Sequence, residues 1–248
     1  MSKKVILITG ASRGIGRAAA VQAGQRGWSV AVNYVGNREA AEEVVHTVQE
    51  AGGEAISVQG DVAVEADVIN MFNQTARLGP LDGVVVNAGI VAPPLPLVEM
   101  SAERLQRMFN VNVLGAYLCA REAAKHLIKS RGGKGGSIVL ISSVAATLGS
   151  PGEYVDYAGS KGAIDTLTRG LAKELGPEGV RVNAVRPGLI DTDIHASGHQ
   201  PDRAWRLGVN APLGRPGTAD EVAEAILWLL SDASSYASGT LLDVSGGR

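Results

Sequence analysis

The sequence predicts an α/β protein in which one doubly wound parallel sheet of about seven strands carries helices on both faces. Three observations support this class. Short β-branched apolar runs alternate with longer helical patterns along the chain. Glycine is abundant, at 32 of 248 residues, which suits tight turns between strands and helices. No repeat or low-complexity linker divides the chain, so we expect a single domain, 1–248.

The elements of the first half follow one another without interruption. Their expected order is strand 5–9, a helix ending near 26, strand 28–34, helix 39–51, strand 54–58, helix 65–78 and strand 83–87. In the second of these helices, Ala41, Val44 and Val48 recur with the spacing of a buried helix face. Right-handed crossovers would bring the strands into one parallel sheet.

The second half continues the alternation and breaks it once. Its expected elements are a proline-rich loop 92–96, a long helix 101–129, strand 137–143, a helix opening near 155, strand 180–185, helix 220–230 and strand 240–244. The break is 189–217, which carries two of the four His and three of the ten Pro but no strong periodicity. Because so long a loop inside a compact domain is usually functional, we interpret it as a substrate lid.

Composition and charge exclude several classes of protein. The net charge is −2, the pI is about 6.1 and no basic cluster is present, so nucleic acid is not an expected partner. Cys119 is the one cysteine, which excludes an intrachain disulfide and fits a reducing compartment. The apolar run before Gly10 is too short for a signal peptide, and no apolar run is long enough to span a membrane. We expect a soluble, cytoplasmic protein.

A glycine-rich turn, 9–16, lies between the first strand and the first helix. A phosphate-binding turn requires this context, because glycine lets the backbone approach a pyrophosphate and the helix N-terminus offers free N–H groups. An ordinary glycine-rich turn without a ligand is the alternative. The residues expected to hold a nucleotide here are Gly10, Ser12, Arg13, Gly14, Ile15 and Gly16.

The end of the second strand indicates which nucleotide is bound. A site for NAD usually places an acid there, which bonds the ribose hydroxyls. Residues 32–38 contain no acid, whereas Arg13 and Arg38 could flank a 2′-phosphate. Arg38 could equally be a solvated charge on the following helix. We therefore favour NADP(H) over NAD(H), and we add Asn33 and Arg38 to the expected cofactor contacts.

Tyr157 and Lys161 lie four residues apart on a helix, so both project from one face. A tyrosine has a pKa of about 10, and an ammonium about 4 Å away would stabilise the phenolate by roughly 4 kcal/mol. We predict that Lys161 lowers the pKa of Tyr157 by about two to three units, so that the phenol can exchange a proton with a substrate oxygen. Ser143, at a strand end, would hold that oxygen. Taken alone, the pair could be a buried tyrosine beside a solvated lysine.

Together these features resemble the short-chain dehydrogenase/reductase family over essentially the whole chain. The matching motifs are Thr9-Gly-x-x-x-Gly-Ile-Gly16, Asp61-Val62, Asn87-Ala-Gly89, Asn112, Ser143, Tyr157-x-x-x-Lys161 and Pro187-Gly188. The glucose dehydrogenase-like and 3-oxoacyl-carrier-protein reductase-like branches are the most similar. The resemblance implies a Rossmann-type domain and an NADP(H)-dependent oxidoreductase, which transfers a hydride between the nicotinamide and a small carbonyl or secondary alcohol substrate.

The resemblance also implies a role for each matching position. Asp61 and Val62 would contact the adenine, while Asn87, Ala88 and Gly89 would line the cofactor. The residues against the nicotinamide would be Pro187, Gly188, Ile190 and Thr192. The catalytic set would be Asn112, Ser143, Tyr157 and Lys161, with Tyr157 as acid/base, Lys161 also bonding the nicotinamide ribose and Asn112 holding a water. Asn110 and Ser142 compete with two of these; we prefer Ser143 because Val-Ala-Ala follows it, as in the family.

Several questions stay open at the level of sequence. The resemblance implies a homotetramer formed through apolar stretches on the long helix, in 225–230 and in 241–242. The substrate could be a sugar, a polyol, a ketone or an acyl thioester. Epimerase or dehydratase chemistry on the same fold and cofactor is one alternative, and a non-catalytic nucleotide-sensing protein is another. His195 and His199 are spaced like metal ligands but lack a third partner, so we expect no metal and treat them as lid residues.

Overall fold

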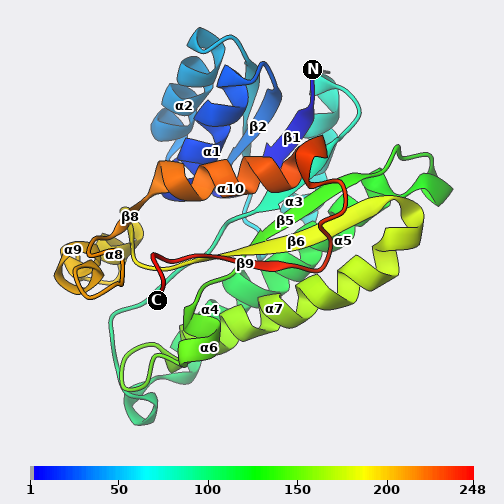
Figure 1. Ribbon diagram of the computed structural model, residues 1–248. Helices are drawn as coiled ribbons and strands as arrows, with labels where there is room; N and C mark the ends of the chain where they lie inside the picture. The colour runs from blue at the N-terminus through cyan, green and yellow to red at the C-terminus, as the bar shows by residue number, and fades with distance from the viewer. Residues whose placement is uncertain (1–2) are drawn as a thin grey trace.

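The computed structural model describes residues 3–248. Its main sheet has seven parallel strands in the order β3-β2-β1-β4-β5-β6-β9 (Figure 1). These strands are β1 (Val5–Ile8), β2 (Ser29–Tyr34), β3 (Glu54–Gln59), β4 (Gly83–Val86), β5 (Gly136–Ile141), β6 (Val180–Pro187) and β9 (Leu241–Val244). The strand order reverses at β1, as in a doubly wound sheet, so the predicted fold class is confirmed.

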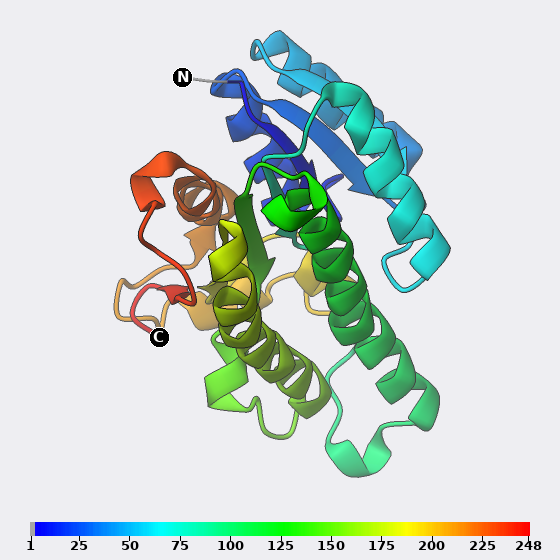
Figure 2. The ribbon, with the colours of Figure 1, turned by 90° about the vertical axis from the view of Figure 1, so that its right-hand side faces the viewer.

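Helices cover both faces of the sheet. One face carries α1 (Gly14–Gln25), α2 (Arg38–Glu50) and α10 (Ala219–Leu230). The other carries α3 (Glu65–Thr75), α5 (Gly115–Leu127) and α7 (Val155–Leu175), which lie towards the viewer in Figure 2. The shorter helices are α4 (Ala102–Phe109), α6 (Ala145–Leu148), α8 (Ile194–Ser197) and α9 (Arg203–Gly208). No helix within 3–248 is both long and apolar enough to cross a lipid bilayer.

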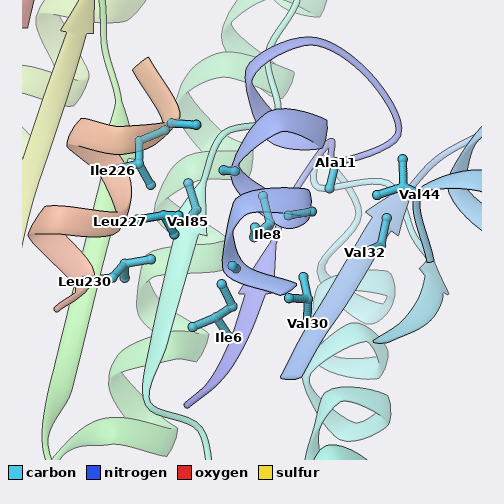
Figure 3. Close-up of a cluster of buried hydrophobic side chains, with 14 of the residues drawn as sticks. Ile6, Ile8, Ala11, Val30, Val32, Val44, Val85, Ile226, Leu227 and Leu230 are labelled. Atoms are coloured by element: carbon cyan, nitrogen blue, oxygen red, sulfur yellow. The ribbon is translucent and has the colours of Figure 1, made fainter. Parts of the chain in front are cut away.

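The central strands β1 and β4 are apolar throughout because both of their faces are buried. Ile6 and Ile8 point into the core under α1 and α10, whereas Leu7 points into the core under α3 and α5. All three are fully buried. Figure 3 shows the first of these cores, in which Ile226 and Leu227 of α10 lie over the sheet. This two-sided burial favours Val, Ile and Leu at successive positions, which made the strands recognisable in the sequence.

The expected helix 101–129 contains a wider turn. The chain forms α4, then a π-helical turn over Asn110–Leu114, and then α5. Such turns add one residue to the helical ladder and often occur at functional sites. A Cβ atom on Gly115 would lie 2.7 Å from Cγ2 of Val62, so α5 begins in close contact with the chain after β3. The π turn therefore lies next to the carboxyl edge of the sheet.

Residues 189–217 are more ordered than the sequence predicts. They contain α8, α9 and the strand β7 (Ile190–Asp191), which pairs in parallel with β8 (Gly217–Thr218). These elements are too short to produce a detectable periodicity. In Figure 1, α8 and α9 stand together at one end of the molecule, beyond the ends of the central strands.

Candidate active site

The glycine turn after β1 has the backbone geometry that only glycine tolerates well. Gly10 has a φ of +62° and Gly14 a φ of +55°, both in the left-handed region. A Cβ atom on Gly16 would lie 2.6 Å from the carbonyl oxygen of Gly10 and 2.7 Å from Nδ2 of Asn87. Arg13 precedes α1 in an extended conformation, and its side chain does not cap the helix. The first turn of α1 therefore keeps N–H groups available for an anion.

Two side chains hold this turn against β4. The hydroxyl of Thr9 accepts hydrogen bonds from the backbone N–H groups of Asn87 and Ala88, both at 2.9 Å. The amide of Asn87 donates to the carbonyls of Thr9 and Gly10, at 2.8 and 3.0 Å. Sequence reasoning did not give Thr9 a site role, although a threonine that ends an apolar strand was a usable signal. Asn87 and Ala88 thus lie beside the turn, next to Gly89.

Asn33 lies at the end of β2 but points into the protein. Its side chain is buried; Oδ1 accepts from the N–H of Gly10 at 3.0 Å, and Nδ2 donates to the carbonyls of Val58 and Gly60 at 3.2 and 3.0 Å. Both ends of the amide are therefore occupied by the protein itself. We correct the expected cofactor contact accordingly: Asn33 fixes the glycine turn relative to β2 and β3.

A groove of about 580 Å³ opens at the carboxyl ends of β2 and β3. Its lining includes Tyr34, Arg38, Gly60, Asp61 and Asp67. Asp61 is fixed at both ends: its N–H donates to Asp67, and its carboxylate accepts from the N–H two residues on, each at 2.9 Å. The Arg38 side chain is 78% exposed, and its Nε lies 3.6 Å from a carboxylate oxygen of Glu42. An exposed guanidinium thus lies among the residues that line a polar groove.

Val62 is buried rather than open to the groove, since it packs against Gly115 at the start of α5. Ser12 and Ile15 are partly exposed in the turn itself. Of the residues expected at the adenine end, Asp61 and Arg38 therefore line the groove, whereas Val62 packs against the start of α5.

The structure brings Ser143, Tyr157 and Lys161 together at the carboxyl end of β5. Ser143 follows that strand; its hydroxyl accepts from the N–H of Ala145 at 3.1 Å and lies close enough to the Tyr157 hydroxyl to lower the pKa of that phenol. The Lys161 ammonium lies 5.5 Å from the centre of the Tyr157 ring. It donates to the carbonyl of Ile141, the last residue of β5, at 2.7 Å. The helix spacing predicted the tyrosine–lysine pair, and the strand end supplies the serine.

The predicted direction of the Tyr157 pKa is wrong for this site. Burial raises the pKa of Tyr157 to about 12, and the hydrogen bond from Ser143 only partly offsets that rise. Burial lowers the pKa of Lys161 to about 8, while the negative charge of Asp165 opposes the fall. The ammonium does not lower the phenol's pKa because Lys161, with a pKa of about 8, has lost its charge before the pH at which the phenol ionises. At neutral pH the phenol therefore keeps its proton and can donate it.

Asn112 lies in the π turn and is buried. Its Oδ1 accepts from the N–H of Ile90 at 2.8 Å, and its Nδ2 donates to the carbonyl of the same residue at 3.0 Å. A Cβ atom on Gly89 would meet Oδ1 of Asn112 at 3.4 Å and the Lys161 ammonium at 3.6 Å. Asn112 thus fixes the chain after β4 beside Lys161. Asn110, its competitor, is exposed.

The chain at the end of β6 and after it connects Ser143 to the glycine turn. The hydroxyl of Ser143 lies 3.5 Å from the carbonyl of Pro187, and a Cβ atom on Gly188 would lie 2.8 Å from the Ser245 backbone. Thr192 approaches Gly14, where an added Cβ would lie 3.6 Å from it. Pro187 and Ile190 are buried, while Gly188 and Thr192 are partly exposed. Residues 187–192 therefore run from Ser143 to the glycine turn.

The segment 189–217 is tied to both ends of the site. Arg13 donates to the Ser197 hydroxyl at 3.2 Å, which joins the glycine turn to α8. Arg203 of α9 forms an ion pair with Glu153 at 2.6 Å and lies 4.8 Å from the centre of the Tyr154 ring. Both partners of Arg203 precede α7. The segment thus bridges the glycine turn and the chain just before α7, the helix that carries Tyr157 and Lys161.

Comparison with known proteins supports a single family. A family model described as enoyl-(acyl carrier protein) reductase matches residues 10–248. The chain is 51% identical to the uncharacterized oxidoreductase YgfF of Escherichia coli, with 98% of this chain and 99% of that protein covered. It is 41% identical to versicolorin reductase stcU of Emericella nidulans and 39% identical to L-rhamnose 1-dehydrogenase (NAD(P)(+)) of a Sphingomonas species, each over 98% of this chain and 95% of the other.

Solved structures of similar proteins have the same fold. Levodione reductase superposes with a TM-score of 0.91 at 31% identity, covering 98% of this chain and 96% of the other. A short-chain type dehydrogenase/reductase from Mycobacterium marinum gives a TM-score of 0.91 at 34% identity, covering 99% and 95%. Both likenesses extend over the whole sheet and its helices.

Proposed function

The chain belongs to the short-chain dehydrogenase/reductase family of NAD(P)-dependent oxidoreductases acting on CH–OH and carbonyl groups, and on that basis we propose that it is an NADP(H)-dependent carbonyl reductase with Tyr157 as its acid. The observation that carries the proposal is the placement of Ser143, Tyr157 and Lys161 at the same sheet edge as the glycine turn. Ligands of open α/β sheets bind at that edge.

The proposed reaction depends on a proton held at a defined atom. When bound, the nicotinamide supplies or accepts the hydride. The Tyr157 hydroxyl, protonated at neutral pH, donates its proton to the carbonyl oxygen of the substrate, and Ser143 hydrogen-bonds the same oxygen as its charge grows. Lys161 carries positive charge beside the tyrosine, and Asn112 lies near it, beside Gly89. The phenol is proposed to regain its proton past these two side chains. The reverse reaction is an alcohol oxidation and is favoured by higher pH, since it releases a proton.

The glycine turn fits a dinucleotide pyrophosphate because a side chain at Gly16 would collide with the backbone beside it. Gly10, Gly14 and the N–H groups of α1 would hold the phosphates, while Asp61 would face the adenine end. The choice of NADP(H) is supported by Arg13 and Arg38, the cations near the turn and groove, and by the absence of an acid in 32–38. The name of the Sphingomonas relative covers both nucleotides and so does not discriminate.

We expect Arg13→Ala to weaken NADPH binding by about 10- to 100-fold and to leave NADH binding within about twofold. A charge-assisted hydrogen bond to a 2′-phosphate is worth roughly 1.5–3 kcal/mol, and NADH lacks that phosphate. Fluorescence titration of both nucleotides measures the difference. Arg17→Ala is the matched control, because Arg17 lies on α1 but its side chain faces Glu43 at 3.8 Å. Equal losses for NADPH and NADH would contradict the assignment.

The substrate is proposed only as a small molecule with a carbonyl or secondary alcohol group. Residues 189–217 are proposed to act as its lid, on the strength of the Arg203–Glu153 and Arg13–Ser197 contacts. The test is a screen of NADPH and NADH against sugars, polyols, diketones and a 3-oxoacyl thioester. Absorbance at 340 nm must change if a hydride is transferred. Substrate conversion without that change would instead support epimerase or dehydratase chemistry, and tight NADPH binding without any turnover would support a nucleotide-sensing protein.

We also propose that the protein is a homotetramer, because large apolar side chains are exposed on two faces. Phe109, Leu114 and Tyr117 lie on the α4–α5 face, and Trp228 lies on α10. Closed two-fold symmetry would bury each face against its own copy. Light scattering at micromolar concentration should give about four times the chain mass, and the mass of a single chain would reject the proposal.

The fully buried Cys119 fits a reducing compartment, and we propose the cytoplasm as the location of the protein.

A further inference from the structure

A partly buried cluster of charges lies between α7 and the sheet. Asp165 stands one turn after Lys161 on α7 and is 8% exposed. One oxygen of its carboxylate accepts from the Ser142 hydroxyl at 2.6 Å, and the other accepts from Arg186 at 3.3 Å. Arg186, on β6, also holds both carboxylate oxygens of Asp243 on β9, at 2.5 and 2.9 Å. The carboxylate of Asp165 is thus connected to three strands of the sheet.

This cluster joins the two elements that carry the catalytic groups. Ser142 directly precedes Ser143, and its hydroxyl lies 2.6 Å from Asp165 and 3.1 Å from the carbonyl of Lys161. The end of β5 is therefore fixed to α7 at the level of Lys161. The Lys161 ammonium reaches back to β5 as well, where it donates to the Ile141 carbonyl at 2.7 Å. The position of Ser143 relative to the phenol and the ammonium depends on these contacts.

We propose that Asp165 is a positioning residue of the reaction, which keeps the ammonium of Lys161 charged and, through Ser142, keeps the strand end in place. The inference rests on the function proposed above, in which Lys161 acts as a cation. A buried ammonium without a nearby anion loses its proton readily. Burial already lowers the pKa of Lys161 to about 8, and the negative charge of Asp165 opposes that fall.

The charges around Lys161 determine whether each substitution raises or lowers the pKa of Lys161. The groups that face the Lys161–Asp165 pair are Tyr157 on α7, Arg186 on β6 and, through Arg186, Asp243 on β9. Tyr157 is neutral near pH 8, because its pKa is raised to about 12. Removing the charge of Asp165 should therefore lower the pKa of Lys161. Removing the charge of Arg186, which offsets that of Asp165, should raise it.

The test compares the pH profiles of kcat/KM and of NADPH affinity in wild type, Asp165→Asn, Ser142→Ala and Arg186→Met. In wild type, kcat/KM and NADPH affinity are expected to fall above about pH 8, where Lys161 loses its proton; this fall is the basic limb of each profile. Asp165→Asn retains an oxygen for Ser142 but no charge, so the limb should move down by about one pH unit. Ser142→Ala retains the charge, so kcat should fall several-fold while the limb stays in place. Arg186→Met should move the limb upwards.

The outcomes separate this inference from the proposed function. An Asp165→Asn limb that coincides with the wild-type limb overturns the inference, as does an equal shift in Ser142→Ala. If Asp165→Asn does not fold, the upward shift in Arg186→Met decides the question. NADPH affinity is measured without turnover. The wild type and the variants could all be inactive on every substrate while their NADPH affinity profiles still shift as expected. That result would overturn the proposed reaction and support the role of Asp165.

Discussion

Tyr157→Phe should lower kcat by about 10²- to 10⁴-fold and leave the Kd for NADPH within about twofold of wild type. The substitution removes the hydroxyl that we propose as the proton donor, and general acid catalysis contributes a factor of this size. It retains the ring, which packs beside the Lys161 ammonium at 5.5 Å. Because only the transition state uses the donated proton, the loss should appear in kcat and kcat/KM alike. Initial rates at 340 nm and a fluorescence titration of NADPH provide the two measurements.

Tyr236→Phe is the matched control. Its ring is fully exposed, so removal of its hydroxyl should leave kcat within about twofold, as surface substitutions usually do. A Tyr157→Phe enzyme with wild-type rates would show that the proton comes from elsewhere. A variant that loses NADPH affinity and kcat together would show that the hydroxyl supports the binding site instead.

Arg104→Met should lower the free energy of unfolding by about 3–5 kcal/mol, the cost of leaving a buried charge without its partner. Arg104 bonds Asp156 through two nitrogens, at 2.9 and 3.3 Å, and the Asp156 side chain is fully buried. The same guanidinium donates to the carbonyl of Pro93, and Asp156 directly precedes Tyr157. The pair therefore joins α4, the loop before it and the start of α7. Urea denaturation at one fixed protein concentration measures the change.

Arg121→Met is the control for an exposed ion pair. Arg121 bonds Glu65, and both side chains are about half exposed, so its loss should cost less than about 1 kcal/mol. The double substitution of Arg104→Met with Asp156→Leu should recover most of the lost stability, because no uncompensated charge then remains buried. Equal costs for Arg104→Met and Arg121→Met would show that the buried pair is as well solvated as the exposed one.

Local patterns were sufficient for the fold. Strands buried on both faces are short runs of Val, Ile and Leu, and the helices between them show their period, so the order of elements could be read from the chain. The expected helix 101–129 missed its π turn because one additional residue in a helical ladder leaves no clear mark in the spacing of apolar residues. The helices α8 and α9 of residues 189–217 were missed for a related reason, since neither is long enough to show a period.

The sequence by itself determined the order of strands and helices, the glycine turn and the shared face of Tyr157 and Lys161, because these depend on spacing along one element. The tertiary structure decided the raised pKa of Tyr157, the inward direction of Asn33 and the contact of Asp165 with Arg186. Each of these depends on which distant segments cover a group and remove water from it. Spacing along the chain fixes neighbours, whereas burial and the pKa values that follow from it are properties of the packed molecule.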